Sequence, residues 1–212
     1  MTTKTEQLDA LFQEWRGRQG EQAAGFAPDG IIEEPAWDAA PRKVLFLAKE
    51  PNEYSDDLRV LWRRKPWKTL GRWAYGLQNV QESRIPHFVE ATQDYRNAFA
   101  ACAIVNLKKS PGGSSADPQE IQKALESNCD FVLREMEIIR PDIVVCCGTF
   151  DSVQKCLLPL PQVVEANAEG WYIFQSMVLI KYCHPSAPYS ESMMYYGLVG
   201  AYHAFLARQG DS

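Results

Sequence analysis

Four short, almost purely apolar segments recur along the chain, and each leads into a polar stretch that contains Pro or Gly. The segments are 43–48, 101–106, 142–147 and 176–182. Runs of this length without alternating polar residues are typical of strands covered on both faces of a sheet. Stretches with helical spacing of apolar residues lie between them. We therefore expect an α/β protein, a three-layer α/β/α sandwich with a mostly parallel central sheet.

The remaining elements are predicted from periodicity and from helix signals. Asp117 is expected to cap a helix that begins at Pro118, with Glu120 completing a capping box. Segment 19–41 is rich in Gly and Pro and is predicted to be a loop. Helices are expected over 5–18, 56–79 (broken at Pro66 and Gly71), 87–100, 118–140, 150–157 and 190–208, and a further strand over 171–174.

Size and composition favour one domain. The 212 residues suffice for a single core, on which residues 1–41 are expected to pack as an N-terminal helix and loop. No apolar run is long enough to span a membrane, and the first residues lack a signal-peptide core, so a cytoplasmic protein is expected. The six cysteines form no CxxC pair. We expect reduced structural thiols and no metal site.

The charge distribution leaves two interpretations open. The net charge of -5 weighs against strong non-specific binding to nucleic acid. Segment 59–73 nevertheless combines six Lys and Arg residues with Trp62, Trp67 and Trp73. It is either a face that binds a nucleic-acid backbone or an amphipathic helix that buries its tryptophans.

Three polar segments follow predicted strands: 48–52, 106–113 and 184–190. The carboxyl ends of parallel strands meet at one edge of a sheet, where open α/β proteins keep their ligand crevice. Pro185 cannot continue a sheet ladder, so the chain leaves the sheet directly after His184. The three segments are therefore expected to converge on one site.

These segments, in this order, resemble motifs of the uracil-DNA glycosylase superfamily. Segment 44–52 is similar to the family's first motif, and 104–113 to the strand whose terminal Asn reads the base. Segment 138–148 resembles its unit of helix, Arg-Pro, strand and Gly, and 184–186 its last motif. The resemblance covers about 43–205. It implies a uracil-DNA-glycosylase-like fold and hydrolysis of the N-glycosidic bond of a damaged or deaminated base in DNA repair.

The resemblance also assigns roles to individual residues. Cleaving a base from its sugar leaves negative charge on the base, and the family's last-motif histidine, here His184, stabilises it as an oxyanion donor does. Asn106 would read the base edge with one donor and one acceptor. Glu50, directly before the proline of the first loop, would position the attacking water. The alternative for each is structural: a capped strand end, a turn former and a surface glutamate.

Further contacts follow from the same resemblance. Trp67 would stack on the extruded base, and Pro51 and Asn52 in the first loop would also bind the base. Backbone contacts to DNA are expected from Lys108, Lys109, Gly112, Gly113, Ser186 and Tyr189. The family's iron–sulfur branches use a cysteine pair near the N-terminus. The first cysteine here is Cys102, so we expect no cluster and no other cofactor.

We expect a monomer that acts on damaged DNA. A second function class stays open, because a fold does not establish an activity: a module that binds a nucleobase or nucleic acid in the same pocket without cleaving it. A thiol nucleophile at Cys183 is disfavoured, since Cys183 and His184 would point to opposite faces of a strand. No phosphate-binding loop or dinucleotide fingerprint is present.

Overall fold

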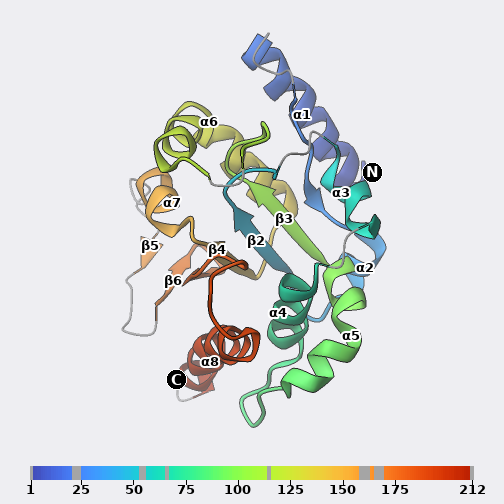
Figure 1. Ribbon diagram of the computed structural model, residues 1–212, viewed down its shortest axis with the longest axis vertical. Coiled ribbons are helices and arrows are strands. Elements are labelled where there is room, and N and C mark those ends of the chain that lie inside the picture. Colours follow the sequence, from blue (N-terminus) through green and yellow to red (C-terminus); the bar gives the residue numbers. More distant parts are fainter. Residues whose placement is uncertain are drawn as a thin grey trace.

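The computed structural model describes residues 2–20, 25–52, 56–64, 67–113, 116–157, 163–164 and 170–210, arranged as an α/β protein (Figure 1). Its strands are β1 (Gly30–Ile31), β2 (Val44–Ala48), β3 (Cys102–Asn106), β4 (Ile143–Cys147), β5 (Val163–Val164), β6 (Trp171–Phe174) and β7 (Met177–Tyr182). Its helices are α1 (Lys4–Gln19), α2 (Glu34–Ala39), α3 (Leu58–Leu61), the 3-10 helix η2 (Trp62–Arg64), α4 (Lys68–Asn79), α5 (Phe88–Ala100), α6 (Pro118–Ile139), α7 (Phe150–Leu157) and α8 (Glu191–Gly210). None of the helices in these ranges is long and apolar enough to cross a membrane.

The strands form one mixed sheet in the order β1-β3-β2-β4-β7-β6-β5. Its centre is parallel, because β2 pairs with β3 on one side and β4 on the other, and β4 pairs with β7. The edge strands β1, β6 and β5 are antiparallel to their neighbours. The order of the parallel strands reverses at β2. A crevice at the carboxyl ends of β2 and its neighbours is the usual place for a ligand in such sheets.

Helices cover both faces of the sheet, which gives three layers. Helices α1, α6 and α7 lie on one side, and α4, α5 and α8 on the other (Figure 1). Strand β2 supplies both cores: Leu45 and Leu47 point into the first, Val44 and Phe46 into the second. Successive side chains of a strand point to opposite faces. The uninterrupted apolar sequence of β2 follows from this two-sided burial.

The helices and the longer strands are confirmed, with bounds shifted by one or two residues, but the predicted loop over 19–41 is wrong. That segment contains β1 and α2. Strand β1 is defined only by its partner, with Gly30 opposite Ile104 and Ile31 opposite Ala103. Pro35 lies in the first turn of α2, where proline is tolerated. A strand of two residues and a helix of six residues are too short to show a period.

Gly71 does not interrupt a helix, contrary to the prediction, because α4 runs through it from Lys68 to Asn79. A Cβ atom at Gly71 would collide with the carbonyl oxygen of Tyr95 in α5. The glycine therefore allows α4 and α5 to approach each other closely. Pro66, the other predicted break, lies outside the described residues.

The start of α6 is as predicted, but the capping box is not. Asp117 accepts a hydrogen bond from the N–H of Gln119 at 2.8 Å, and α6 begins at Pro118. The carboxylate of Glu120 instead binds Nζ of Lys108 at 3.1 Å. The residue expected to close the cap therefore ties α6 to the loop after β3.

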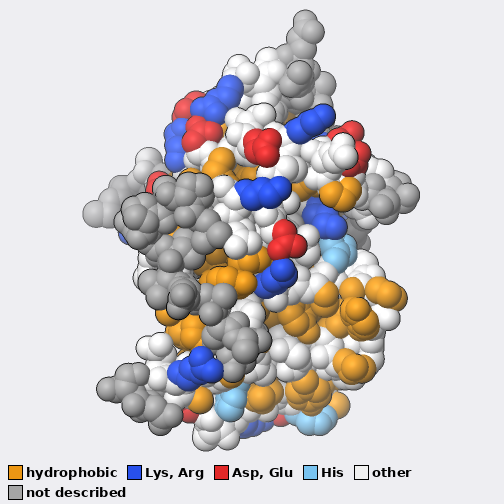
Figure 2. All heavy atoms as spheres, turned by 90° about the vertical axis from the view of Figure 1, so that its left-hand side faces the viewer, with side chains coloured by type: hydrophobic (Ala, Val, Ile, Leu, Met, Phe, Trp, Pro, Cys, Tyr) orange, Lys and Arg blue, Asp and Glu red, His pale blue; other side chains and the backbone are white. Residues whose placement is uncertain are grey.

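The basic, tryptophan-rich segment is largely paired and packed. Trp73 is buried in the second core, and Trp62 and Trp67 pack against it. The ion pairs of the segment are Arg59–Asp57, Arg59–Asp9, Arg63–Glu33 and Arg72–Glu191. These contacts favour the amphipathic interpretation over a dedicated backbone-binding face. Figure 2 draws another side of the molecule, the left-hand side of Figure 1, on which charges of both signs are interspersed. Lys65 lies outside the described residues.

The expectation of reduced cysteines is wrong for one pair. Cys129 of α6 and Cys156 of α7 form a disulfide with a Cα–Cα distance of 6.0 Å, within the range that the bond geometry requires. Cys102, Cys146, Cys147 and Cys183 are free. Burial raises the pKa of Cys146 to about 12 and the pKa of Cys147 well above its usual value. Such thiols are poor nucleophiles.

Candidate functional site

A cavity of about 620 Å³ lies at the carboxyl ends of the central strands. All three polar segments predicted to converge contribute to its wall. Of the predicted site residues, it is lined by Glu50, Pro51, Asn52, Trp67, Asn106, Gly113, His184 and Ser186. The wall also includes Lys49, Asp56, Lys68 and Cys147, which the sequence reasoning did not assign to the site. The predicted DNA contacts Lys108, Lys109, Gly112 and Tyr189 are not part of the wall.

Main-chain hydrogen bonds hold the first two segments side by side beyond the end of the sheet. The N–H of Leu107 donates to Ala48 O and that of Lys108 to Lys49 O, both at 3.0 Å. The N–H of Gly112 donates to Pro51 O at 3.0 Å. These contacts extend the parallel pairing of β2 and β3 into the loops. Since the Gly112 amide is already used, it does not fit the predicted role as a phosphate donor.

His184 follows β7 and lies at the cavity. Its Nδ1 accepts a hydrogen bond from the backbone N–H of Ser186 at 3.2 Å. In the neutral ring the proton is therefore on Nε2. Partial burial, together with the positive charge of Lys49, lowers the pKa of His184 below its usual value. The histidine is thus a neutral side chain with one N–H donor at neutral pH.

Gly148, directly after β4, has both Lys49 and His184 as close neighbours. Its φ angle is +68°, and a Cβ atom there would lie 3.6 Å from Cε of Lys49 and 3.7 Å from Cβ of His184. The Gly148 N–H donates to Tyr182 O at 2.8 Å, which fixes the turn next to β7. The ammonium group and the imidazole therefore lie on the same side of the cavity.

Glu50 is held in place by a cation. Its side chain is 6% exposed, and its carboxylate binds Nζ of Lys108 at 2.7 Å. A Cβ atom at Gly112 would overlap that carboxylate, so the glycine makes room for it. Burial opposes the charge of Lys108, but its hydrogen bonds to Glu50 and Glu120 raise its pKa. Lys108 is therefore the counterion of Glu50 and lies between two carboxylates, which does not fit a primary DNA contact.

Asn106, the last residue of β3, lines the cavity, and its side chain is held by hydrogen bonds to a buried residue. Asp29 Oδ2 accepts hydrogen bonds from the Asn106 backbone N–H at 2.7 Å and from Nδ2 at 3.0 Å. Asn106 is 2% exposed and Asp29 is 0% exposed. Sequence reasoning missed Asp29, because it lies in the segment predicted to be a loop. Its proximity to β1, which pairs with β3, brings it to Asn106.

Lys109 is buried, so the predicted contact between its side chain and DNA does not fit the structure. Its ammonium, 0% exposed, binds Asp29 Oδ1 at 2.5 Å and Glu135 Oε2 at 2.8 Å. It also lies over the rings of Trp15 and Phe12, at 5.1 and 5.3 Å from their centroids. Burial opposes its charge, but Asp29 and Glu135 raise the pKa of Lys109. Lys109 thus balances buried carboxyl groups beneath the cavity.

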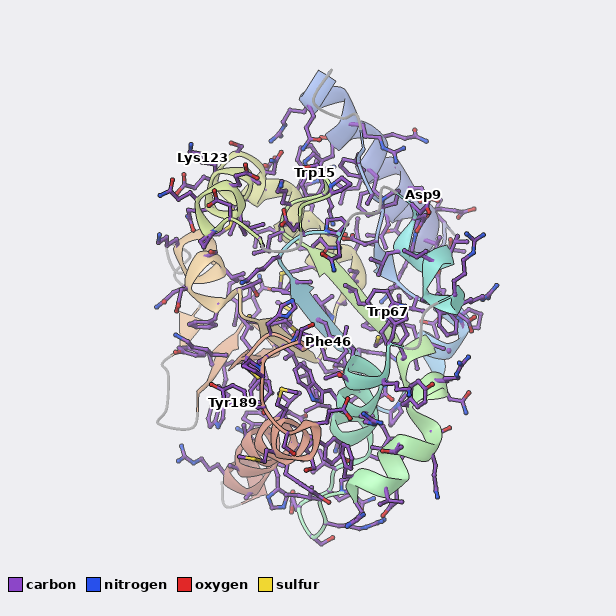
Figure 3. All side chains as sticks on the ribbon, viewed as in Figure 1. Asp9, Trp15, Phe46, Trp67, Lys123 and Tyr189 are labelled. Atoms are coloured by element: carbon purple, nitrogen blue, oxygen red, sulfur yellow. A yellow bond between two sulfur atoms is a disulfide. The ribbon has the colours of Figure 1, made fainter. Side chains whose placement is uncertain are left out.

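The two aromatic residues predicted to contact DNA, Trp67 and Tyr189, lie in different surroundings. Trp67 lines the cavity, while its ring stacks on Phe99 with centroids 5.4 Å apart and an interplanar angle of 9°. Tyr189 is 64% exposed and lies outside the cavity wall, in the loop before α8. Figure 3 shows Trp67 to the right, above α4, and Tyr189 to the lower left, above α8. Trp67 is positioned to contact a ligand in the cavity. Tyr189 is a surface residue of segment 184–190, which contributes His184 and Ser186 to the cavity wall.

No group of three or more His, Cys, Asp or Glu side chains that could hold a metal ion is found within the described ranges. The cavity wall instead offers neutral and charged hydrogen-bonding groups: the imidazole of His184, the amide of Asn106, the carboxylate of Glu50 and the ammonium of Lys49. This set can bind a polar ring and stabilise charge on it.

Comparisons with known proteins give no independent assignment. No protein-family model matches the sequence, and no curated protein matches it.

Proposed function

We propose that the protein is a DNA glycosylase that hydrolyses the N-glycosidic bond of an extruded, uracil-like base, as its resemblance to the uracil-DNA glycosylase superfamily implies. The observation that carries this proposal is the meeting of Glu50, Asn106 and His184 in one cavity. Its volume of about 620 Å³ lies in the range of pockets that enclose a small ligand. A base in a duplex reaches such a pocket only by leaving the stack.

The roles follow from the charges that the reaction develops. As the bond between C1′ and the base nitrogen breaks, its electron pair goes to the base and positive charge builds on the sugar. The Nε2–H of neutral His184 donates to a carbonyl oxygen of the departing base, and the nearby Lys49 ammonium adds positive potential. Glu50 orients a water whose oxygen bonds to C1′ and whose proton the carboxylate accepts.

One observation favours a second function, a module that binds a base without cleaving it. The Glu50 carboxylate is bound to Lys108 at 2.7 Å, and this cation makes it a weaker proton acceptor. The net charge of -5 also disfavours tight binding to a long duplex. In this alternative the cavity holds the base through Asn106 and His184, and no bond is broken.

Strand cleavage after alkali treatment distinguishes the two functions. Labelled single- and double-stranded oligonucleotides would carry uracil, hypoxanthine, xanthine, thymine opposite guanine or 5-hydroxymethyluracil. We expect abasic sites with at least one base, and a decrease of roughly 10²–10³-fold in rate for His184→Ala. The matched control is His203→Ala, which removes a histidine that binds Glu82 O in the region of α8. If the protein binds the oligonucleotides but forms no product at high protein concentration and low salt, the glycosylase proposal fails and the binding module is the better proposal.

A further inference from the structure

A fully buried charged group lies directly beneath the residue proposed to read the base. Asp29 precedes β1, which pairs with β3, and its Oδ2 accepts both the backbone N–H and the side-chain Nδ2–H of Asn106. These contacts join residues 77 positions apart in sequence. Their distances of 2.7 and 3.0 Å are those of well-formed hydrogen bonds.

Lys109 and Glu135 keep Asp29 in this role. Lys109 Nζ binds the other Asp29 oxygen, Oδ1, and both oxygens of Glu135, at 3.0 and 2.8 Å. Burial raises the pKa of Glu135 well above its usual value; Lys109 opposes this effect and Asp29 adds to it. Lys109 thus joins the two carboxyl groups, and only Asp29 of the two contacts Asn106. Asp29 remains bound to Lys109 on one oxygen and to Asn106 on the other.

Both oxygens of Asp29 act as acceptors, Oδ1 for Lys109 and Oδ2 for Asn106. In this arrangement Asp29 binds the N–H side of the Asn106 amide. Rotating the amide by half a turn would place its oxygen against Asp29 Oδ2, and two acceptors at hydrogen-bond distance in a buried site repel each other. The remaining Nδ2–H and the oxygen Oδ1 keep a fixed arrangement.

We infer that Asp29 is a positioning residue that sets which base edge the cavity accepts, an inference that rests on the proposed function. With the base placed by His184 at one carbonyl, the fixed Asn106 amide offers Oδ1 to a ring N–H and Nδ2–H to the adjacent carbonyl. That pattern matches the imide or lactam edge of uracil, thymine or hypoxanthine. Cytosine presents a ring acceptor beside an amino group, the reverse pattern, and would need the amide rotated.

Binding without cleavage tests the inference separately from catalysis. Short oligonucleotides would carry 2′-fluoro-2′-deoxyuridine, its N3-methyl derivative or 2′-fluoro-2′-deoxycytidine, because fluorine destabilises the sugar cation and preserves the bond. An abasic analogue gives the baseline. Fluorescence anisotropy should show the uridine probe bound at least about tenfold more tightly than the cytidine or N3-methyl probes.

Two isosteric variants separate positioning from structural support. Asp29→Asn offers an acceptor and a donor, so either amide orientation is accommodated and the uridine-to-cytidine ratio should fall towards one. Glu135→Gln changes the other carboxyl group bound to Lys109 and leaves both hydrogen bonds from Asn106 to Asp29 in place, so the ratio should stay within about twofold of the native value. Thermal unfolding of both variants reports whether they fold.

The outcomes are distinct. A native protein that binds all three base probes equally, or an equal loss of discrimination in Glu135→Gln, overturns the inference while leaving a base-binding cavity. If no base probe binds better than the abasic analogue, the proposed function fails and the inference with it. If Asp29→Asn does not fold, the N3-methyl and cytidine probes on the native protein still decide whether Asn106 presents an acceptor.

Discussion

Nζ of Lys108 lies 2.7 Å from the Glu50 carboxylate and 3.1 Å from that of Glu120, so one cation joins the loop after β2 to the start of α6. Glu50 is nearly buried, whereas the Glu120 side chain is 62% exposed. The two ion pairs therefore differ in their surroundings. A buried carboxylate that loses its cation remains uncompensated, while an exposed one is hydrated.

Lys108→Met should consequently destabilise the protein by about 1–3 kcal/mol, because Glu50 loses its counterion. Glu120→Gln should change the free energy of unfolding by less than about 0.5 kcal/mol. Urea denaturation followed by tryptophan fluorescence measures both. Equal losses in the two variants would show that the pair with Glu50 has no special weight.

The two adjacent glycines after β3 should respond differently to the same substitution. A Cβ atom at Gly112 overlaps the Glu50 carboxylate, whereas one at Gly113 meets no atom within 4 Å. Gly112→Ala should therefore displace Glu50 and cost about 1–3 kcal/mol, with a loss of catalysis or ligand binding at the cavity. Gly113→Ala should preserve both properties. Activity and chemical denaturation of the pair check this, and a fully active Gly112→Ala would count against a role for Glu50.

The His184 ring should titrate below its ordinary value of about 6.5, because partial burial and Lys49 both disfavour its charged form. The folded protein then binds its proton less readily than the unfolded chain. The stability that this residue contributes is present above the unfolded pKa and is lost as the pH falls through the folded pKa.

NMR titration of the imidazole tests the cause of this shift. Lys49→Met removes the charge and keeps most of the stem, so the pKa of His184 should rise while staying below about 6.5 through burial. Lys68→Met, which changes another lysine of the cavity wall, should leave it unaltered. A native His184 pKa above the ordinary value would contradict the neutral donor in the proposed mechanism.

The Cys129–Cys156 disulfide makes a measurable difference to both chemistry and stability. Unfolded but unreduced protein should react with a thiol reagent at four of its six cysteines. Cys129 and Cys156 are 27 residues apart in the sequence. In the chain-entropy account, a disulfide that closes a loop of this length adds about 3–4 kcal/mol to the free energy of unfolding. The double variant Cys129→Ser/Cys156→Ser should lose that amount, whereas Cys183→Ser should lose little. Six reactive thiols would mean that the bond is not formed.

The sequence was sufficient to predict the central strands and the polar residues at their ends. Strands β2 and β4 are buried on both faces, so their residues are apolar throughout, and the parallel pairing then brings Glu50, Asn106 and His184 to one edge. Each of these inferences needs only the local pattern and the general rule for parallel sheets.

Residues whose role depends on a distant partner could not be predicted in the same way. Asp29 and Lys109 are charged residues in segments whose sequence is typical of a surface. They are 80 residues apart in the sequence, and only the fold brings them together as a buried pair. Trp67 was expected at the base, yet its ring also has Phe99 to stack on. The disulfide likewise depends on how α6 and α7 pack, which the spacing of two cysteines does not encode.

The link between Asp29 and the end of β3 also has a consequence for the order of folding. During synthesis, Asp29 leaves the ribosome long before Asn106 and Lys109, the groups that donate hydrogen bonds to its carboxylate. Contacts of such sequence separation carry a large loop-closure cost and form late. The ligand cavity is therefore expected to be one of the last parts of the molecule to take shape, after both helical layers have the chance to dock.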